Sequence, residues 1–151
     1  MTTLNIRPAT PQQRDWATNL MARSEPWITL GMTAETCATA CSDLELQLYI
    51  AHQDERPSGF VLLHPHGLAG SPYIKSVCVA EDTRSQGTGT ALILFAEKLF
   101  RGESKHIFLC VSSFNKRAQK FYQRLGYHQV GKLKDYIMAG ESELLLHKSL
   151  S

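Results

Sequence analysis

Apolar positions along the chain follow two spacings, and the first of them is typical of strands. Short apolar runs occupy residues 4–9, 46–53, 58–65, 73–80 and 106–111, and residues that favour turns bound most of them. The stretches "DERP" (54–57) and "LAGSP" (68–72) separate three of these runs. We therefore expect strands in these segments, with hairpin turns at the two stretches.

The second spacing, with apolar residues at i, i+3 and i+4, is typical of helices. It predicts a helix from residue 11, a short helix at about 34–42, a helix over 88–101 and a last helix after residue 115. Thr10, Thr33 and Asn115 are suitable N-caps for three of them, and Gly126 is a suitable C-cap for the last. Residues 127–137 and 141–150 then close the chain as two more strands.

The resulting order is β-α-α-β-β-β-α-β-α-β-β. The strands at 73–80 and 106–111 flank a helix, so they should be parallel neighbours joined by a right-handed crossover. The remaining strands can pair by hairpins. The sequence thus predicts an α/β (α+β) fold, with a mixed sheet and helices on its faces.

Composition narrows the class of protein. The 151 residues fit one domain, 1–151, and 43% are apolar and 20% charged, as in ordinary globular proteins. A net charge of +2 is too small to indicate nucleic-acid binding. No run reaches the roughly 20 apolar residues of a membrane span, and the N-terminus lacks a signal-peptide pattern, so we expect a cytoplasmic protein. The four cysteines have no partners at zinc spacing, so we expect no metal.

The stretch "RSQGTG" (84–89) stands where the strand at 73–80 leads into a helix. Glycines at a helix N-terminus let the backbone approach a phosphate closely. A Walker A loop would need a lysine after Gly89, where Thr90 stands, and a dinucleotide fingerprint would need a small residue in place of Leu92. The pattern that remains is R-x-x-G-x-G, from Arg84 to Gly89.

A second motif follows the next strand, in "SSFNKRAQKFYQRLGY" (112–127). Its spacing is N-x-x-A-x-x-x-Y-x-x-x-G-Y, carried by Asn115, Ala118, Tyr122, Gly126 and Tyr127. Together with "VCVAEDTRSQGTGTALI" (77–93) it resembles the GNAT superfamily, the GCN5-related N-acetyltransferases. The resemblance extends over nearly the whole chain in the order and length of the elements.

This resemblance implies a mixed sheet of six to seven strands, in which the fourth and fifth strands splay apart, flanked by about four helices. It also implies acetyl-CoA as cosubstrate, with its pantetheine arm along the fourth strand and its pyrophosphate on the glycine turn. The implied binding residues are Val77, Cys78, Val79, Arg84, Ser85, Gln86, Gly87, Thr88, Gly89, Thr90, Asn115 and Ala118.

The resemblance also implies a reaction, in which a primary amine attacks the thioester directly in a ternary complex. Tyr122 matches the family's usual general acid, which protonates the departing thiolate. A backbone N–H near Val79 could stabilise the oxyanion. The alternative is a non-catalytic acyl-CoA-binding sensor or interaction module of the same fold, which would not need a proton donor at the sulfur.

The general base is left open by the sequence. Some relatives carry a glutamate on the fifth strand, where Cys110 stands here. Glu81, directly after the fourth strand, is one candidate; His64 and His66 are others, and water molecules leading to bulk solvent could serve instead.

The resemblance further implies an acceptor pocket between the first helical loop and the turn of the last two strands. Glu25, Trp27 and Tyr136 are the candidate contacts there, because carboxylates and aromatic rings suit a cationic amine. The acceptor would be a small-molecule or peptide amine. A homodimer through the C-terminal strands is plausible for such a fold.

Overall fold

The computed structural model describes residues 3–84 and 86–151, and over these residues it confirms the predicted order of elements. The strands are β1 (Leu4–Pro8), β2 (Gln47–Gln53), β3 (Arg56–Leu68), β4 (Ser71–Val79), β5 (His106–Ser112), β6 (His128–Leu133) and β7 (Glu143–Ser149). The helices are α1 (Pro11–Ala22), α2 (Ala34–Ser42), α3 (Thr88–Phe100) and α4 (Lys116–Arg124), with a 3₁₀ turn η1 at Glu81–Thr83. Within the described residues no helix is long and apolar enough to span a membrane.

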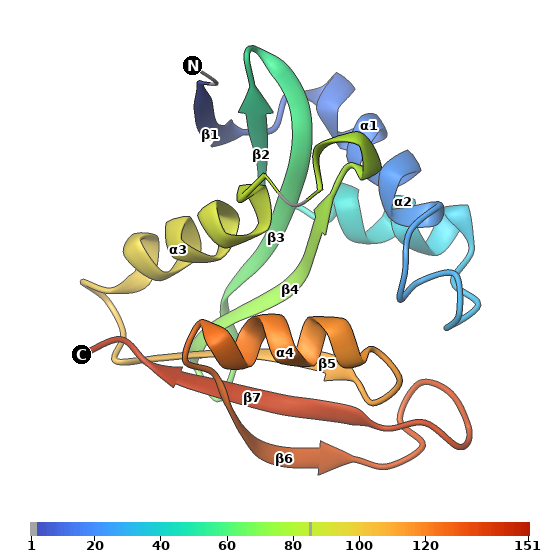
Figure 1. Ribbon diagram of the computed structural model, residues 1–151, viewed down its shortest axis with the longest axis vertical. Helices are drawn as coiled ribbons and strands as arrows, with labels where there is room; N and C mark the ends of the chain where they lie inside the picture. Colours follow the sequence, from blue (N-terminus) through green and yellow to red (C-terminus); the bar gives the residue numbers. More distant parts are fainter. Residues whose placement is uncertain (1–2, 85) are drawn as a thin grey trace.

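The strands form a mixed sheet in the order β1-β2-β3-β4-β5-β7-β6, and helices cover both of its faces (Figure 1). Helices α1 and α2 pack on β2, β3 and β4 through one buried cluster, which includes Leu20, Cys41 and Phe60. Helices α3 and α4 pack on the other face through a second cluster, which includes Leu92 and Tyr122. The sheet therefore separates two cores.

The predicted caps are confirmed. Thr10 and Gln13 form a reciprocal capping box at the start of α1, and Thr33 caps α2 through the amide of Thr36. Gly126 follows α4 with φ +97°, the left-handed conformation that a C-cap glycine adopts at low cost. The predicted strand 127–137 is too long, because β6 ends at Leu133 and the chain then turns.

Strands β4 and β5 are parallel, as predicted, but their pairing is short. It comprises Tyr73 with Phe108 and Ile74 with Leu109. The next residue, Lys75, is an extra residue in β4, since Ile74 and Ser76 oppose consecutive residues of β3. A bulge of this kind bends a strand and increases its twist. In Figure 1, β4 accordingly runs steeply across the direction of β5 and β7.

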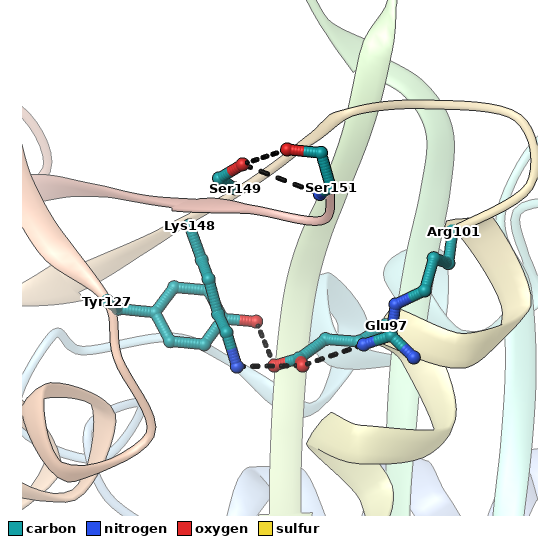
Figure 2. Close-up of polar contacts among 6 residues, drawn as sticks. All are labelled: Glu97, Arg101, Tyr127, Lys148, Ser149 and Ser151. Atoms are coloured by element: carbon teal, nitrogen blue, oxygen red, sulfur yellow. Dashed lines mark hydrogen bonds and ion pairs between the residues drawn. The ribbon is translucent and has the colours of Figure 1, made fainter.

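A buried carboxylate joins α3 to the C-terminal strands. Glu97 is fully buried and accepts a hydrogen bond from the Tyr127 hydroxyl at 2.9 Å and one from Lys148 Nζ at 2.8 Å (Figure 2). Arg101 Nη2 lies 3.8 Å from the same carboxylate, one helical turn away. Because the charge is paired and hydrogen-bonded, this arrangement holds α3, the start of β6 and β7 in one relative position.

Candidate active site

The candidate site is the opening between β4 and β5, which we call the β4–β5 opening. One wall is residues 75–79 of β4 and the other is residues 110–112 of β5, and neither segment pairs with the other. Within the described residues, the edge of β4 at 75–79 that faces β5 has no strand partner. Apart from the Val79 carbonyl, which accepts a hydrogen bond from Arg84, this edge is open to an extended ligand, which could pair there as a strand does. Val77, Cys78 and Val79 lie on this wall.

The glycine turn lies at the mouth of this opening. Gly87 is the N-cap of α3 and has φ +85°, a conformation that other residues rarely adopt. No side chain caps the helix there, so the first-turn amides of α3 are free for an anion. Thr88 is buried, whereas Thr90 is half-buried and Gln86 is exposed and bonded to Gln53. Ser85, also predicted to bind, lies outside the described residues.

Gly89 and Arg84 tie this turn to β4. A Cβ atom on Gly89 would lie 3.6 Å from a methyl group of Val79 and 3.4 Å from the ring of Phe121, so α3 begins directly between β4 and α4. Arg84 Nε donates to the Val79 carbonyl at 3.2 Å. Sequence analysis missed Gly59 of β3. A Cβ atom there would lie 2.8 Å from the Cys78 carbonyl oxygen, so a glycine is needed for this close contact with β4.

Helix α4 forms the side of the opening next to β5. Asn115 Oδ1 accepts a hydrogen bond from the Ala118 amide at 3.2 Å, which confirms its predicted capping role. The Gln119 side chain donates to the carbonyls of Ser112 and Ser113 at 3.0 Å each. These bonds fix the last residues of β5 against the helix that carries Tyr122.

Tyr122 is buried in the core between α4 and the sheet, with its ring edge-on to that of Tyr127 at 6.0 Å between centroids. Its hydroxyl makes no hydrogen bond to any residue that the structure describes. Burial, and to a lesser degree the neighbouring Cys78 thiol, raises the pKa of Tyr122. The phenol therefore stays protonated and unpartnered beside the β4 wall.

The other predicted catalytic candidates lie away from the opening or at its margin. Glu81 is exposed in η1, in a hollow of about 430 Å³ that Arg23, Ser24 and Arg84 also line. His64 and His66 lie near the turn between β3 and β4. This turn is at the N-terminal end of β4, whereas Val79 is at the C-terminal end.

The predicted acceptor contacts differ in their surroundings. Glu25 is exposed, and its carboxylate accepts hydrogen bonds from the Thr29 amide and hydroxyl, which lower the pKa of Glu25. Trp27 is packed into the core beneath α1 and α2. Tyr136 is exposed on the turn between β6 and β7 and lies near Tyr73.

A group of polar residues, of which sequence analysis singled out only Cys110, lies on the sheet face away from α3 and α4. Tyr73, Cys110, Ser112 and Glu143 come from β4, β5 and β7, and the Ser112 hydroxyl donates to Glu143 at 2.6 Å. Burial raises the pKa of Glu143, while its bond from Ser112 partly offsets that rise. A signal did exist, because Glu143 begins an apolar strand in "ESELLL" (141–146).

These features fit acetyl-CoA as a substrate. An unpaired strand edge suits the amides of pantetheine, and uncapped helix amides suit a pyrophosphate. A protonated phenol beside the same strand suits a departing thiolate. Among the described residues no cluster of His, Cys, Asp or Glu could hold a metal ion.

Comparison with known proteins identifies the family of this chain. The model of the acetyltransferase (GNAT) family matches residues 11–127. An uncharacterised N-acetyltransferase of Methanocaldococcus jannaschii is 32% identical over 102 residues, which are 66% of this chain and 64% of that protein. The match thus spans slightly less than two thirds of the relative's length.

Solved structures share the fold. Ard1 from Thermoplasma volcanium superposes with a TM-score of 0.80 at 17% identity, covering 97% of both chains. An aminoglycoside 6′-N-acetyltransferase, solved with coenzyme A, superposes with a TM-score of 0.79 at 18% identity, again covering 97% of both chains. The chain belongs to the acetyltransferase (GNAT) family. The predicted family, fold and enzyme class, that of the acyltransferases, are therefore confirmed.

Proposed function

We propose that this protein transfers the acetyl group of acetyl-CoA to a primary amine, by direct attack of the amine in a ternary complex. The observation that carries the proposal is the β4–β5 opening, with an unpaired strand edge between an uncapped helix N-terminus and a free phenol. Val77–Val79 would bind pantetheine, and the turn from Arg84 to Thr90 the pyrophosphate. Asn115 and Ala118 would border the arm from α4.

Tyr122 is the proposed general acid. As the C–S bond breaks, negative charge develops on sulfur, and a neutral phenol can donate its proton to it. Burial raises the pKa of Tyr122, so a free tyrosinate is disfavoured and the hydroxyl must regain a proton promptly. Its lack of an internal hydrogen-bond partner among the described residues leaves it available for the substrate.

The acceptor is proposed to enter between the loop after α1 and the turn after β6, near Glu25, Trp27 and Tyr136. The aminoglycoside acetyltransferase with the same fold suggests a polycationic small molecule as one class to test, beside peptide amines. Three further properties belong to this proposal: the protein is cytoplasmic, it forms a homodimer through the C-terminal strands, and it does not bind nucleic acid.

The test is Tyr122→Phe, assayed by release of the CoA thiol with amino acids, polyamines, aminoglycosides and peptide N-termini. We expect kcat to fall about 10² to 10⁴-fold, as for loss of a general acid, with acetyl-CoA affinity unchanged in calorimetry. The substitution leaves the ring in place and breaks no bond to a described residue, so folding should be unaffected. Unchanged turnover would remove Tyr122 from the mechanism.

The same assay separates the alternative function. A non-catalytic acyl-CoA sensor would bind acetyl-CoA in calorimetry, yet release no thiol beyond the rate without protein for any amine of the panel. Substituting Gly89→Glu provides the control for binding, because a carboxylate between β4 and α4 would meet the pyrophosphate with like charge.

A further inference from the structure

Glu143 is a buried carboxylate that the proposed function does not yet use. It is the first residue of β7, opposite Ser112 of β5, and more than nine-tenths of it is buried. The Ser112 hydroxyl donates to it at 2.6 Å, and no residue that the structure describes forms an ion pair with it. A buried charge without a cation is costly, so its retention calls for a reason.

Glu143 lies close to the β4–β5 opening. The pairing of β4 and β5 stops at Ile74 and Leu109, so Ser112 and the adjoining Glu143 border the opening from the β5 side. The backbone bond from the Ser113 amide to the Ser142 carbonyl, at 2.8 Å, holds the start of β7 there. Glu143 is thus fixed on β7 beside the β5 wall of the opening, in contact with Ser112.

Glu143 and Tyr122 lie on opposite faces of the sheet. Leu144 belongs to the same buried cluster as Tyr122, and neighbouring residues of a strand point to opposite faces. His64, which pairs with Tyr73, and His147 of β7 also lie on the Glu143 face. The groups nearest Glu143 there are Cys110 of β5, Tyr73 of β4 and Tyr136 near Tyr73; burial raises the pKa values of Cys110 and Tyr73, and Glu143 adds a smaller contribution. None of the three carries a positive charge.

We propose that Glu143, held by Ser112, binds the ammonium group of the acceptor and accepts its proton, directly or through one water. Tyr73 and Tyr136 add aromatic rings near this carboxylate, which suits a cationic alkylamine. This inference rests on the proposed function.

The proton balance is complete. The ammonium gives one proton to Glu143, and its nitrogen then forms the C–N bond to the acetyl carbonyl carbon. The C–S bond breaks, and the thiolate takes the Tyr122 proton. The nitrogen's second proton, lost as the amide forms, restores the phenol through solvent, and Glu143 releases its own proton to solvent. The net change is ammonium plus acetyl-CoA to amide, CoA thiol and one free proton.

Two other carboxylates are less suited to this role. Glu81 is exposed in the hollow that Arg23 and Arg84 line, where cations compete for its charge. Glu25 accepts both hydrogen bonds from Thr29, which hold its carboxylate in a local turn. Glu143, in contrast, has only a hydroxyl partner among the described residues, so a carboxylate oxygen is left for an ammonium.

The experiment compares wild type, Glu143→Gln and the exposed, remote Glu103→Gln, using the alkylamine of the panel that wild type acetylates best and an arylamine that is neutral at pH 7. We expect Glu143→Gln to lower kcat/KM for the alkylamine about 10² to 10⁴-fold, the usual worth of a general base. The fall in kcat/KM should be much smaller for the arylamine, because its neutral nitrogen has no proton to lose before attack. Glu103→Gln should match wild type.

The pH profile gives a second measurement. Wild-type kcat/KM should rise with pH through a limb set by Glu143, and this limb should be missing in Glu143→Gln. Equal losses for both amines would mean a structural role and would overturn the inference, as would an unchanged rate and profile. If wild type acetylates no amine of the panel, the proposed function itself fails. If wild type is active and Glu143→Gln has the same rates and pH profile, the proposed function stands, but Glu143 is not its base.

Discussion

Two buried glutamates lie on opposite faces of the C-terminal half of the sheet, and their surroundings differ sharply. Glu97 on α3 is bonded to Lys148 and Tyr127, with Arg101 close by (Figure 2). Glu143 on β7 has one hydroxyl partner, Ser112, and no cation among the described residues. Both carry a formal charge in an apolar setting, but only the charge of Glu97 is compensated.

The difference separates a structural carboxylate from a reactive one. A buried ion pair that is fully hydrogen-bonded is rigid, and removing one partner leaves the other group buried without a partner. A buried carboxylate without a cation is destabilising at neutral pH, and such groups gather at functional sites. The two residues should therefore respond to substitution in opposite directions, which experiments on stability can test.

The largest effect is expected for Glu97→Ala. This change leaves the half-buried Lys148 ammonium and the buried Tyr127 hydroxyl without their acceptor, and we expect the free energy of unfolding to fall by about 3–5 kcal/mol. Urea unfolding followed by circular dichroism measures it. Glu97→Gln, which keeps an acceptor and the shape, is the matched control and should lose less. A loss below about 1 kcal/mol for alanine would show that the ion pair is not structural.

A smaller effect is expected for Tyr127→Phe. The ring stays packed against Tyr122, while Glu97 loses one of its hydrogen bonds, at 2.9 Å. A hydrogen bond to a charged group contributes about 1.5–3 kcal/mol, so we expect a loss in that range, again by urea unfolding. Acetyl transfer per folded molecule should stay close to wild type, because the lost hydroxyl faces Glu97 and not the opening. A fall in kcat as large as that of Tyr122→Phe would contradict this separation.

Much of the fold could be predicted because its signals are local. Thr10, Thr33 and Asn115 cap helices through bonds to residues three positions ahead, and the helical and strand spacings follow from one face being buried. The parallel neighbourhood of β4 and β5 followed from the helix between them. The site motifs around Gly87 and Tyr122 were likewise readable, since each stands within a few residues of a helix boundary.

What could not be predicted depends on contacts between distant segments. The bulge at Lys75 is visible only when β4 is paired with β3, and Gly59 matters only because the Cys78 carbonyl of β4 and side chains of α3 pack against it. Likewise Lys148 donates a hydrogen bond to Glu97, 51 positions away in the sequence, and Ser112 donates one to Glu143, 31 positions away. Sequence spacing carries no signal of such pairs, so the compensated and the uncompensated carboxylate look alike until the strands are assembled.

The smallest effect, and the one of opposite sign, is expected for the stability of Glu143→Gln. Burial raises the pKa of Glu143, so the folded protein holds this proton more tightly than the unfolded chain does. Below the ordinary carboxyl pKa both states are protonated and the buried group costs nothing. As pH rises through the raised pKa, the folded state must bury a charge, and wild type loses stability that the neutral glutamine keeps. The glutamine oxygen can still accept the bond from Ser112.

Urea midpoints of wild type and Glu143→Gln, measured from acid to neutral pH, should therefore coincide at the acid end and diverge in favour of Glu143→Gln toward neutrality. Glu97→Gln should instead be less stable than wild type at neutral pH. A variant that is less stable than wild type at neutral pH would mean that Glu143, like Glu97, is compensated in the fold, and the contrast between the two carboxylates would be lost.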